Sequence, residues 1–385
     1  MKTNMIYRPI GKTGMSSSII GLGAEHLDFK PYEVMSPVVD AALENGINII
    51  DVFMPGEEVR KNLGRCLSGR RDKIIIQGHI GSTDIGEQYD KSRDRATIQK
   101  YFENLLRCLK TDYIDIGMIF FVDSEKDYAE AFEGDSLAYA LELKKQGHIR
   151  AIGASSHNPV TARKMVETGY LDLLMFSINP AFDMTPANVD ILDYLEGKPL
   201  NHELALDPDR SALYRLCEQR GTAITVMKAF GGGKLLSPEH TPFASPLTVT
   251  QCIHYALTRP AVVSAILGFA TIQEMLSSLA YLSAGEKDRD YTNVIKNYQG
   301  SLKGSCMYCN HCLPCPSGID IARVTKYLDI AVVNETGIPP SIAAHYRELE
   351  NRASDCIACA DCESRCPFAV PVVQNMKKAT ALFGC

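Results

Sequence analysis

The feature that most constrains the fold of this chain is an alternation of strand-like and helix-like segments over residues 1–284. Short runs rich in β-branched and apolar residues predict eight strands: Ile19–Gly23, Asn48–Phe53, Lys73–His79, Ile114–Phe121, Ile149–Ser155, Leu173–Ile178, Thr222–Lys228 and Val263–Gly268. Apolar residues at helical spacing predict helices between them, including Glu33–Glu44, Ala96–Leu109, Leu137–Gln146, Pro159–Glu167, Ser211–Gln219 and Thr271–Leu282. Several of these stretches end at a glycine, which favours helix termination.

Such alternation predicts parallel strands joined by crossover helices, because parallel neighbours need a long connection. Eight units in about 270 residues fit the α/β class and a closed (β/α)8 TIM barrel. A doubly wound open sheet is the alternative, but it would usually carry a G-x-G-x-x-G turn after the first strand, and GLGAEH does not supply one. The connection over residues 179–209 is long and polar, which predicts a functional loop such as a lid.

Composition excludes several classes of protein. With 385 residues, 45% of them apolar and 22% charged, the chain can form a sizeable core in two domains, or in one large domain with an appendix. The net charge, 40 − 46 = −6, argues against nucleic-acid binding. No apolar run reaches about 18 residues and the N-terminus lacks a signal-peptide pattern, so we expect no membrane segment and a cytoplasmic location.

The thirteen cysteines are unevenly distributed. Cys66, Cys108, Cys217 and Cys252 are predicted to be small buried hydrophobic residues. The other nine lie in the last 82 residues. In a chain without a secretion signal, such a cluster of cysteines indicates metal binding in preference to disulfides. This tail, residues 304–385, is predicted to follow a barrel domain of residues 1–284 and a charged linker of residues 285–303.

Two four-cysteine runs define the tail. The second, Cys356, Cys359, Cys362 and Cys366, has the C-x2-C-x2-C-x3-C-P spacing of bacterial two-cluster ferredoxins, and the first, Cys306, Cys309, Cys312 and Cys315, lacks one residue before its last cysteine. In that pattern the fourth cysteine binds the other cluster. The predicted ligand sets are therefore Cys306, Cys309 and Cys312 with Cys366, and Cys356, Cys359 and Cys362 with Cys315.

Other roles for these cysteines, in a zinc site or in disulfides, fit the spacing less well. Zinc sites use paired Cys-x2-Cys units, and disulfides need an oxidising compartment. The segments between the runs have helical patterns, so the tail is predicted to be a small helical ferredoxin-like domain with two [4Fe-4S] clusters. Cys385 has no assigned role.

Residues throughout the chain resemble a known family. The segments YRPIGKTGMSSSIIGLG, ALENGINIIDV, EEVRKNLGRCL, RDKIII, LKTDYIDIGMI, IRAIGASS, MKAFGGGKLL and ILGFATIQEM are similar to the aldo/keto reductase superfamily, and the tail resembles its branch with a C-terminal [4Fe-4S] domain. The resemblance implies a (β/α)8 barrel and nicotinamide-dependent carbonyl reduction by a Tyr, Lys, His and Asp tetrad. Of these four only Asp51 matches; the lysine position is His79, the histidine position is Phe120, and DVFMPGEEV contains no tyrosine.

The resemblance also implies a set of cofactor contacts. The expected nicotinamide contacts fall on Ser155, Ser156 and Asn179, while an expected glutamine is Met175 and an expected aromatic residue is Met227. The phosphate loop after the last strand keeps Gly268 and Thr271 but has no nearby arginine or lysine, which argues against NADPH in particular.

Polar residues at the predicted strand ends are the candidate catalytic residues, because the active site of such a barrel gathers there. His79 is a candidate acid or base with Asp51 fixing its tautomer. Lys228, with Gly231 and Gly232, is a candidate clamp for a phosphate or carboxylate, including one from a cofactor such as FMN. Weaker candidates are His26 and His157.

Three functions remain open at this point. The first is an iron–sulfur oxidoreductase that passes electrons from a carrier such as a ferredoxin or flavodoxin, through the clusters and with or without FMN, to a small organic substrate. A flavin would join one-electron to two-electron chemistry. The second is an NAD(P)H-dependent carbonyl reductase with structural or regulatory clusters. The third is an electron carrier that uses its barrel only for docking.

Overall fold

The computed structural model describes residues 4–85, 88–184, 207–295, 304, 306, 312–332, 338, 340–366 and 368–384. Its backbone divides into two compact units. The first comprises residues 1–178, 221–229 and 262–285, and the second comprises residues 179–220, 230–261 and 286–385. Each is considered by itself, and the predicted boundaries at residues 284 and 303 stay a prediction.

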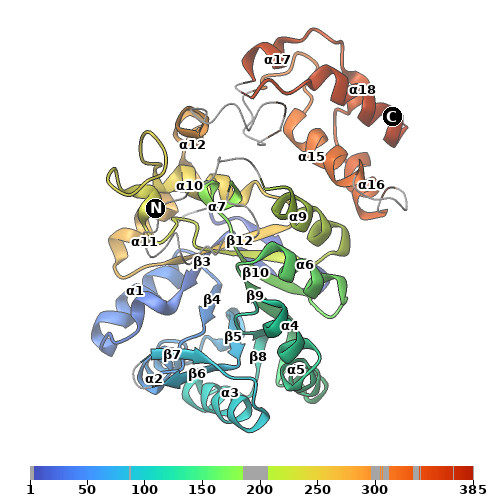
Figure 1. The fold of residues 1–385 in the computed structure, drawn as a ribbon. Helices are drawn as coiled ribbons and strands as arrows, with labels where there is room; N and C mark the ends of the chain where they lie inside the picture. The colour runs from blue at the N-terminus through green and yellow to red at the C-terminus, as the bar shows by residue number, and fades with distance from the viewer. Residues whose placement is uncertain are drawn as a thin grey trace. The chain divides into compact units, whose positions relative to one another are not determined.

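The first unit contains a closed barrel of eight parallel strands, as predicted (Figure 1). Around the barrel the order is β10-β11-β12-β3-β4-β5-β8-β9. The strands are β3 (Ile20–Gly23), β4 (Ile49–Val52), β5 (Ile75–Ile80), β8 (Ile114–Ile119), β9 (Ile149–Ser156), β10 (Leu173–Ser177), β11 (Ala223–Met227) and β12 (Val262–Gly268). Each overlaps one predicted strand, so the alternation in the sequence identified every strand of the barrel.

Two antiparallel hairpins extend the first unit. Strands β1 (Tyr7–Pro9) and β2 (Ser16–Ser18) precede the barrel, and β6 (Ser82–Ile85) pairs with β7 (Gln88–Lys91) directly after β5. The second hairpin was not predicted. Its strands are short and mostly polar, although the Gly-Glu pair between them is a two-residue hairpin signal.

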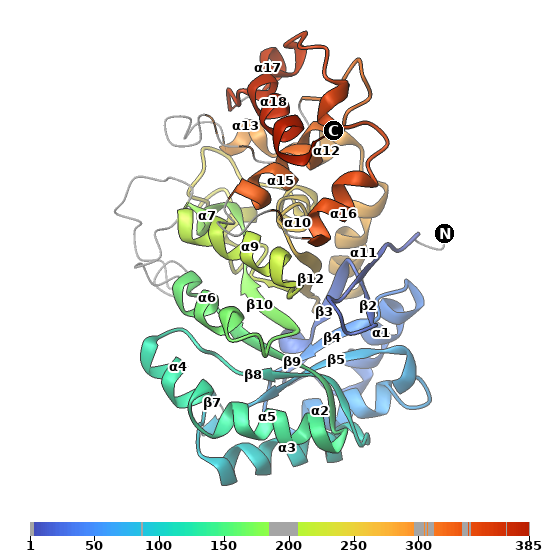
Figure 2. The ribbon, with the colours of Figure 1, turned by 90° about the vertical axis from the view of Figure 1, so that its right-hand side faces the viewer.

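Helices of the first unit lie outside the ring of strands (Figure 2). They are η1 (Ala24–Leu27), α1 (Tyr32–Glu44), α2 (Glu57–Cys66), η2 (Arg71–Lys73), α3 (Arg95–Leu109), α4 (Glu125–Phe132), α5 (Asp135–Gln146), α6 (Pro159–Glu167), α11 (Ile272–Leu279) and η4 (Ala280–Ser283). Local chemistry fixes their ends. The Asp94 side chain accepts from Thr97 N at the start of α3, and Gly147, at φ 82°, ends α5 in a conformation that glycine adopts without strain.

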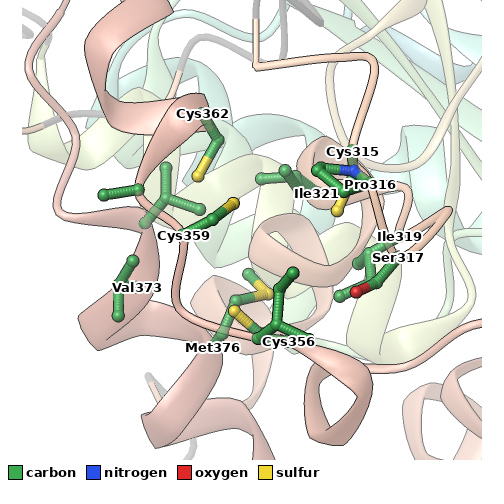
Figure 3. A pocket seen from close by; sticks show the side chains of 13 residues that line it. Cys315, Pro316, Ser317, Ile319, Ile321, Cys356, Cys359, Cys362, Val373 and Met376 are labelled. Atoms are coloured by element: carbon green, nitrogen blue, oxygen red, sulfur yellow. The ribbon is translucent and has the colours of Figure 1, made fainter.

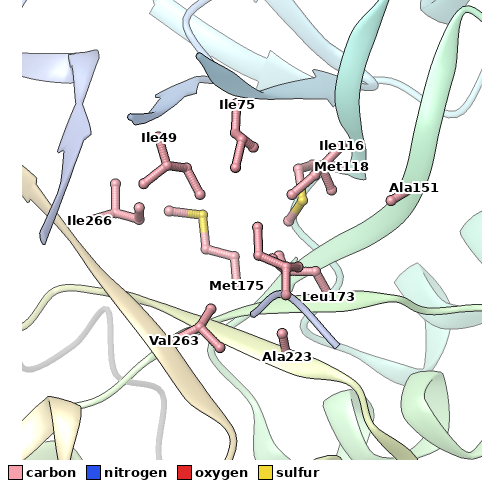
Figure 4. Close-up of a cluster of buried hydrophobic side chains, with 11 residues drawn as sticks. Ile49, Ile75, Ile116, Met118, Ala151, Leu173, Met175, Ala223, Val263 and Ile266 are labelled. Carbon is pink, nitrogen blue, oxygen red and sulfur yellow. The ribbon is translucent and has the colours of Figure 1, made fainter. Parts of the chain in front are cut away.

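The barrel interior is filled by apolar side chains from the strands, together with Ile10 (Figure 4). The cluster comprises Ile10, Ile49, Ile75, Ile116, Met118, Ala151, Leu173, Met175, Ala223, Val263 and Ile266. Gly21 makes room for it, because a Cβ there would lie 2.5 Å from Ile266 Cδ1 and 2.8 Å from Ile49 Cγ2. Burying each large apolar side chain stabilises the fold by about 1.5–3 kcal/mol. The barrel is thus a packed core, and its chemistry lies at the strand ends.

The second unit is helical in the part of the chain that the structure describes. It contains α7 (Pro180–Asp183), α9 (Pro208–Arg220), η3 (Lys234–Leu236), α10 (Val249–Leu257), α12 (Glu286–Arg289), α13 (Thr292–Ile295), α15 (Ile321–Val332), α16 (Pro340–Arg347), η6 (Ala353–Asp355), α17 (Asp361–Arg365) and α18 (Val372–Phe383). Helix α15 packs against α9, α16 and α18. The two helices predicted between the cysteine runs correspond to α15 and α16.

A buried polar network joins three helices of the second unit. Asp183 of α7 accepts hydrogen bonds from Tyr214 Oη of α9 at 2.5 Å and from Tyr255 Oη of α10 at 2.9 Å. Arg210 NH1 lies 3.5 Å from the same carboxylate. Burial raises the pKa of Asp183, and the cations Arg210 and Arg259 act against that rise. Residues 179–184, at the start of the predicted 179–209 loop, are therefore buried structure, and its last two residues begin α9. Residues 185–206 of the proposed lid lie outside the described residues.

The described helices include none that is both long enough and apolar enough to cross a membrane. Cys66, Cys108, Cys217 and Cys252 are buried, as predicted, and burial raises the pKa of each of these thiols. The described cysteines form no disulfide.

Candidate functional site

Two of the predicted catalytic residues are in contact at the carboxyl ends of neighbouring strands. His79 of β5 places Nε2 2.9 Å from Oδ1 of Asp51 at the end of β4. Gln77, one inward-facing position earlier on β5, donates from Nε2 to the same Asp51 oxygen at 2.9 Å. His79 and Asp51 are both only 3% exposed. The sequence prediction that Asp51 orients His79 therefore agrees with their geometry.

The hydrogen bond to Asp51 fixes the tautomer of a neutral His79. A carboxylate can only accept, so Nε2 carries the imidazole proton and Nδ1 presents a lone pair. Nδ1 is buried and has no hydrogen-bond partner among the described residues. Buried polar atoms are nearly always paired, and one without a partner at a strand end is suited to receive a hydrogen bond from a ligand.

Two aromatic rings contact His79. The centroid of the Phe120 ring lies 5.3 Å from the centroid of the imidazole, and that of the Phe53 ring lies 6.0 Å from it, both edge-on. The two phenylalanine rings stack on each other with their centroids 5.8 Å apart. Tyr89 of β7 contacts both, at 5.1 Å from Phe53 and 6.4 Å from Phe120. We call Phe53, His79, Tyr89 and Phe120 the aromatic cluster. Its geometry is that of favourable edge-to-face and offset aromatic pairs, which give His79 apolar surroundings.

A second imidazole–carboxylate pair lies at the end of β9, which is two strands along the barrel from β5. His157, just after β9, places Nδ1 2.8 Å from Asp123 Oδ2, and its backbone N–H donates to Oδ1 at 2.7 Å. Ser156 Oγ donates to that Oδ1 at 3.0 Å. Burial opposes ionisation of Asp123, but the charge and hydrogen bonds of His157 outweigh it and lower the pKa of this carboxyl. The sequence singled out His157 as a candidate without predicting this partner.

The two predicted serines have different partners. Ser155 Oγ accepts from Phe121 N at 2.8 Å and keeps its own proton to donate, whereas Ser156 Oγ is engaged with Asp123. Phe121 has φ 50°, a conformation that is strained for a bulky residue and that clusters at functional sites. Arg93 holds this strand end by donating to the carbonyl oxygens of Phe120 and Phe121.

The remaining predicted cofactor residues fall in different units. Lys228, half-buried with φ 60°, directly follows β11 in the first unit. Asn179, Gly231 and Gly232 belong to the second unit, where Asn179 Oδ1 accepts from Phe182 N and caps α7. Gly231 and Gly232 have φ 58° and 66°, which explains glycine at both positions. A joint anion site of Lys228 with these glycines remains a prediction.

The turn from β12 into α11 is already occupied by side chains. Thr271 Oγ1 accepts from Glu274 N at 3.2 Å, and Glu274 Oε2 accepts from Ala270 N at 2.7 Å and Thr271 N at 3.0 Å. The His26 ring lies directly over Gly268, where an added Cβ would collide with it. Helix N-termini bind phosphate through free N–H groups, so a carboxylate that takes these groups disfavours an additional phosphate here.

Four cysteines from the two runs line one pocket of the second unit (Figure 3). Cys315 comes from the first run, and Cys356, Cys359 and Cys362 from the second. The pocket is partly open to solvent, and Ile321, Val373 and Met376 are among its apolar lining. These are the four residues of one predicted ligand set.

The other predicted set is described only in part. Cys306, Cys312 and Cys366 are described, while Cys309 lies outside the described residues. Among the described residues no three His, Cys, Asp or Glu side chains converge closely enough to bind a single metal ion. A single zinc ion needs every sulfur about 2.3 Å from one point, whereas each thiolate of a cubane binds its own iron atom, so a cluster needs more widely spaced sulfurs.

Comparison with known proteins assigns the fold to a family. The sequence profile described as "Aldo/keto reductase family" matches residues 19–246. The chain is 25% identical over 314 residues to the uncharacterized oxidoreductase YqkF of Bacillus subtilis, covering 76% of this chain and 96% of that protein. It is 30% identical over 164 residues to the aldo-keto reductase YhdN of the same organism, covering 40% of this chain and 47% of that protein.

A solved structure agrees in fold. The holo form of aldo-keto reductase AKR11C1 from Bacillus halodurans superposes with a TM-score of 0.59 at 21% identity. The similarity covers 74% of this chain and 94% of that one.

Proposed function

The chain belongs to the aldo/keto reductase family, whose members are oxidoreductases, and from that premise we propose that it interconverts a small carbonyl compound and its alcohol at the carboxyl ends of its barrel strands. The observation that carries the proposal is the buried His79–Asp51 pair, with Nδ1 of His79 left without a partner. This pair provides a proton-handling group on rigid strands, which is what such a reaction needs beside a hydride carrier.

The part of His79 follows from its tautomer. Asp51 and Gln77 fix the position of the ring, and Asp51 keeps the proton on Nε2. The lone pair on Nδ1 then accepts the hydroxyl proton of an alcohol as that alcohol is oxidised. The Phe53 and Phe120 rings beside His79 exclude water, which strengthens the hydrogen bond between Nδ1 and the hydroxyl.

A nicotinamide dinucleotide is the proposed hydride carrier, as the family resemblance implies; when bound it supplies or accepts the hydride. The Ser155 hydroxyl has a proton to donate and suits a carboxamide oxygen. The turn into α11 does not suit a 2′-phosphate, because Glu274 takes its N–H groups. We therefore propose NADH in preference to NADPH.

The test is turnover of small aldehydes and alcohols with NADH or NAD⁺ by the purified full chain, with His79→Ala as the variant. We expect His79→Ala to lose at least about a hundredfold in the rate of alcohol oxidation, because acid–base groups typically contribute that much. Undiminished oxidation by His79→Ala would exclude His79 from the mechanism. Iron content is measured in parallel and should not change.

A second proposal concerns the tail, and the pocket lined by Cys315, Cys356, Cys359 and Cys362 supports it. We propose that these four thiolates hold one [4Fe-4S] cluster and that Cys306, Cys309, Cys312 and Cys366 hold another. Sulfur-only donors with apolar surroundings fit such a cluster. Ala358 and Ala360, at φ 55° and 62°, bend the second run around the pocket.

Electron delivery from a carrier such as a ferredoxin or flavodoxin to the barrel substrate, with or without FMN, would give these clusters a catalytic role. Anaerobic preparation, with iron and sulfide counted per chain, tests the clusters themselves. Cys359→Ser should lower the iron content, whereas Cys217→Ser, at a buried thiol of α9, should not. Turnover with NADH in clusterless protein would then separate structural or regulatory clusters from catalytic ones.

A further inference from the structure

Three polar side chains lie inside the barrel: Gln77 of β5, Thr225 of β11 and Ser264 of β12, each 0% exposed. Thr225 lies on the same face of β11 as Ala223, a member of the interior cluster two residues earlier. Ser264 Oγ lies 3.2 Å from the position that a Cβ on Gly21 would take among the cluster side chains. We call Gln77, Thr225 and Ser264 the polar layer, because the side chains around them are those of the apolar core.

The pairing of β11 with β12 brings two hydroxyl-bearing residues to the same level. Ile224 pairs with Val262, but the register then shifts by one residue, so Thr225 pairs with Ser264. In a regular ladder Thr225 would instead lie beside Val263. Irregularities of this kind re-aim side chains and recur next to active sites. The shift therefore places Thr225 and Ser264 side by side on neighbouring strands inside the barrel.

The amide of Gln77 has one defined orientation. A carboxylate only accepts hydrogen bonds, so Gln77 presents Nε2 to Asp51, and that nitrogen lies 2.9 Å from Asp51 Oδ1. The same nitrogen lies 3.8 Å from Sδ of Met175, whose side chain extends from β10 into the interior (Figure 4). Met175 pairs with Thr225 of the next strand. The amide thus reaches across the interior towards the strands of the two hydroxyl groups, and its Oε1 is left to accept a hydrogen bond.

One polar atom of each residue in the layer is buried and has no hydrogen-bond partner in the part of the chain that the structure describes: Gln77 Oε1, Thr225 Oγ1 and Ser264 Oγ. Buried polar atoms are nearly always paired, and a buried water molecule typically makes about three hydrogen bonds to such atoms. We infer that the polar layer binds one water molecule, which donates to Gln77 Oε1 and is hydrogen-bonded to the two hydroxyl groups. Water fits this site because all three atoms are uncharged and the side chains around them are apolar.

The bound water extends the hydrogen-bond network of the His79–Asp51 pair across the barrel. With Oε1 held by the water, the Gln77 amide does not rotate, and Nε2 stays on Asp51 Oδ1. That oxygen is also the acceptor for Nε2 of His79. Thr225 and Ser264 are therefore positioning residues that act on His79 through Gln77 and Asp51. Their effect on turnover rests on the proposed function, whereas the water site does not.

The experiment combines a crystal structure of the full chain with three variants. The structure should show one ordered water within hydrogen-bond distance of all three atoms. Thr225→Val keeps the shape of the side chain and removes the hydroxyl, so in urea titration we expect the unfolding equilibrium constant to rise about tenfold, and Thr225→Ser should recover most of that loss. Thr325→Val is the control, because Thr325 of α15 is also buried with an unpartnered Oγ1 among the described residues but lies in the second unit, and it should be at least as stable as the parent. A parent structure with no water at the polar layer, or a Thr225→Val protein as stable as the parent, would overturn the inference.

A spectroscopic measurement tests the positioning role without turnover. Nitrogen-15 NMR distinguishes the two tautomers of an imidazole, and we expect His79 of the parent to show one tautomer, with its proton on Nε2. In Thr225→Val the signals of both tautomers should appear, and Thr225→Ser should restore the single one. An unchanged His79 spectrum in Thr225→Val would reject the positioning role. If the parent binds the water and shows one tautomer but turns over no carbonyl or alcohol, the proposed function fails and the water site stands.

Discussion

Arg365 donates from its guanidinium group to the carbonyl oxygen of Cys312 at 2.7 Å and thereby links the two cysteine runs of the second unit. The same group donates to Pro314 O at 2.7 Å. Arg365 directly precedes Cys366, so this contact holds the end of the second run beside the first. Such an arrangement is what a crossed ligand set of Cys366 with the first run requires.

Removing this link should weaken the proposed cluster of the first run. In Arg365→Ala we expect iron to be lost to a chelator roughly three to ten times faster, because hydrogen bonds from a charged donor that order the ligand loops are removed. Arg323→Ala is the control, since Arg323 forms a local, exposed ion pair with Asp320 in the same unit. Equal rates of iron loss in the two variants would show that Arg365 has no part in cluster retention.

Asp51 is expected to govern which nitrogen of His79 carries the imidazole proton. In Asp51→Asn the side-chain amide donates to Nε2, which moves the imidazole proton to Nδ1 and removes the acceptor there. Alcohol oxidation and carbonyl reduction should both fall by about a hundredfold or more, because they are the two directions of one reaction and share the proton transfer at His79. The two rates are measured with benzyl alcohol and benzaldehyde. Unchanged rates in Asp51→Asn would count against a tautomer-based role.

Sequence patterns predicted the barrel better than they predicted its site. The eight strands could be identified because buried parallel strands are nearly continuous apolar runs. The cysteine ligand sets stay a prediction from ferredoxin spacing, although four of the eight cysteines line one pocket. The place of Tyr89 in the aromatic cluster was missed because β6 and β7 are short and polar. The alternation of apolar and polar residues that marks a strand is therefore absent from this part of the sequence. The His157–Asp123 pair depends on where β8 and β9 end relative to each other, and a single sequence does not encode that register locally.

The His157–Asp123 pair should make stability depend on acid. The pKa of Asp123 is lowered in the folded chain, so its contribution is present above the ordinary value of 3.8 and is lost as pH falls below that value through the folded pKa. Urea unfolding measured from about pH 6 to about pH 3 should show a steeper loss of unfolding free energy in the parent than in Asp123→Asn. The difference approaches at most about 1.4 kcal/mol per pH unit, one proton's worth. Parallel curves would contradict this assignment.

Asp183 should be among the most sensitive positions of the second unit. Asp183→Ala leaves Arg210 buried without its carboxylate and removes the acceptor of Tyr214 and Tyr255, so we expect a loss of about 3–5 kcal/mol in unfolding free energy. Asp183→Asn keeps an oxygen acceptor and should lose less. Urea titration followed by circular dichroism measures both. A cost of Asp183→Ala below that of Asp183→Asn would show that the network does not stabilise the fold.

Glu274 is expected to set the preference between the two nicotinamide dinucleotides. Its carboxylate accepts from Ala270 N and Thr271 N, and its negative charge lies where a 2′-phosphate would need free N–H groups. Glu274→Gln removes the charge and leaves the hydrogen-bonding shape of the cap, so NADPH affinity should rise about tenfold while NADH affinity changes little. Calorimetric titration of each dinucleotide measures this, with Gln273→Glu as a control for added charge elsewhere on α11. If NADPH already binds the parent as tightly as NADH, the cap does not exclude the phosphate and the preference for NADH is wrong.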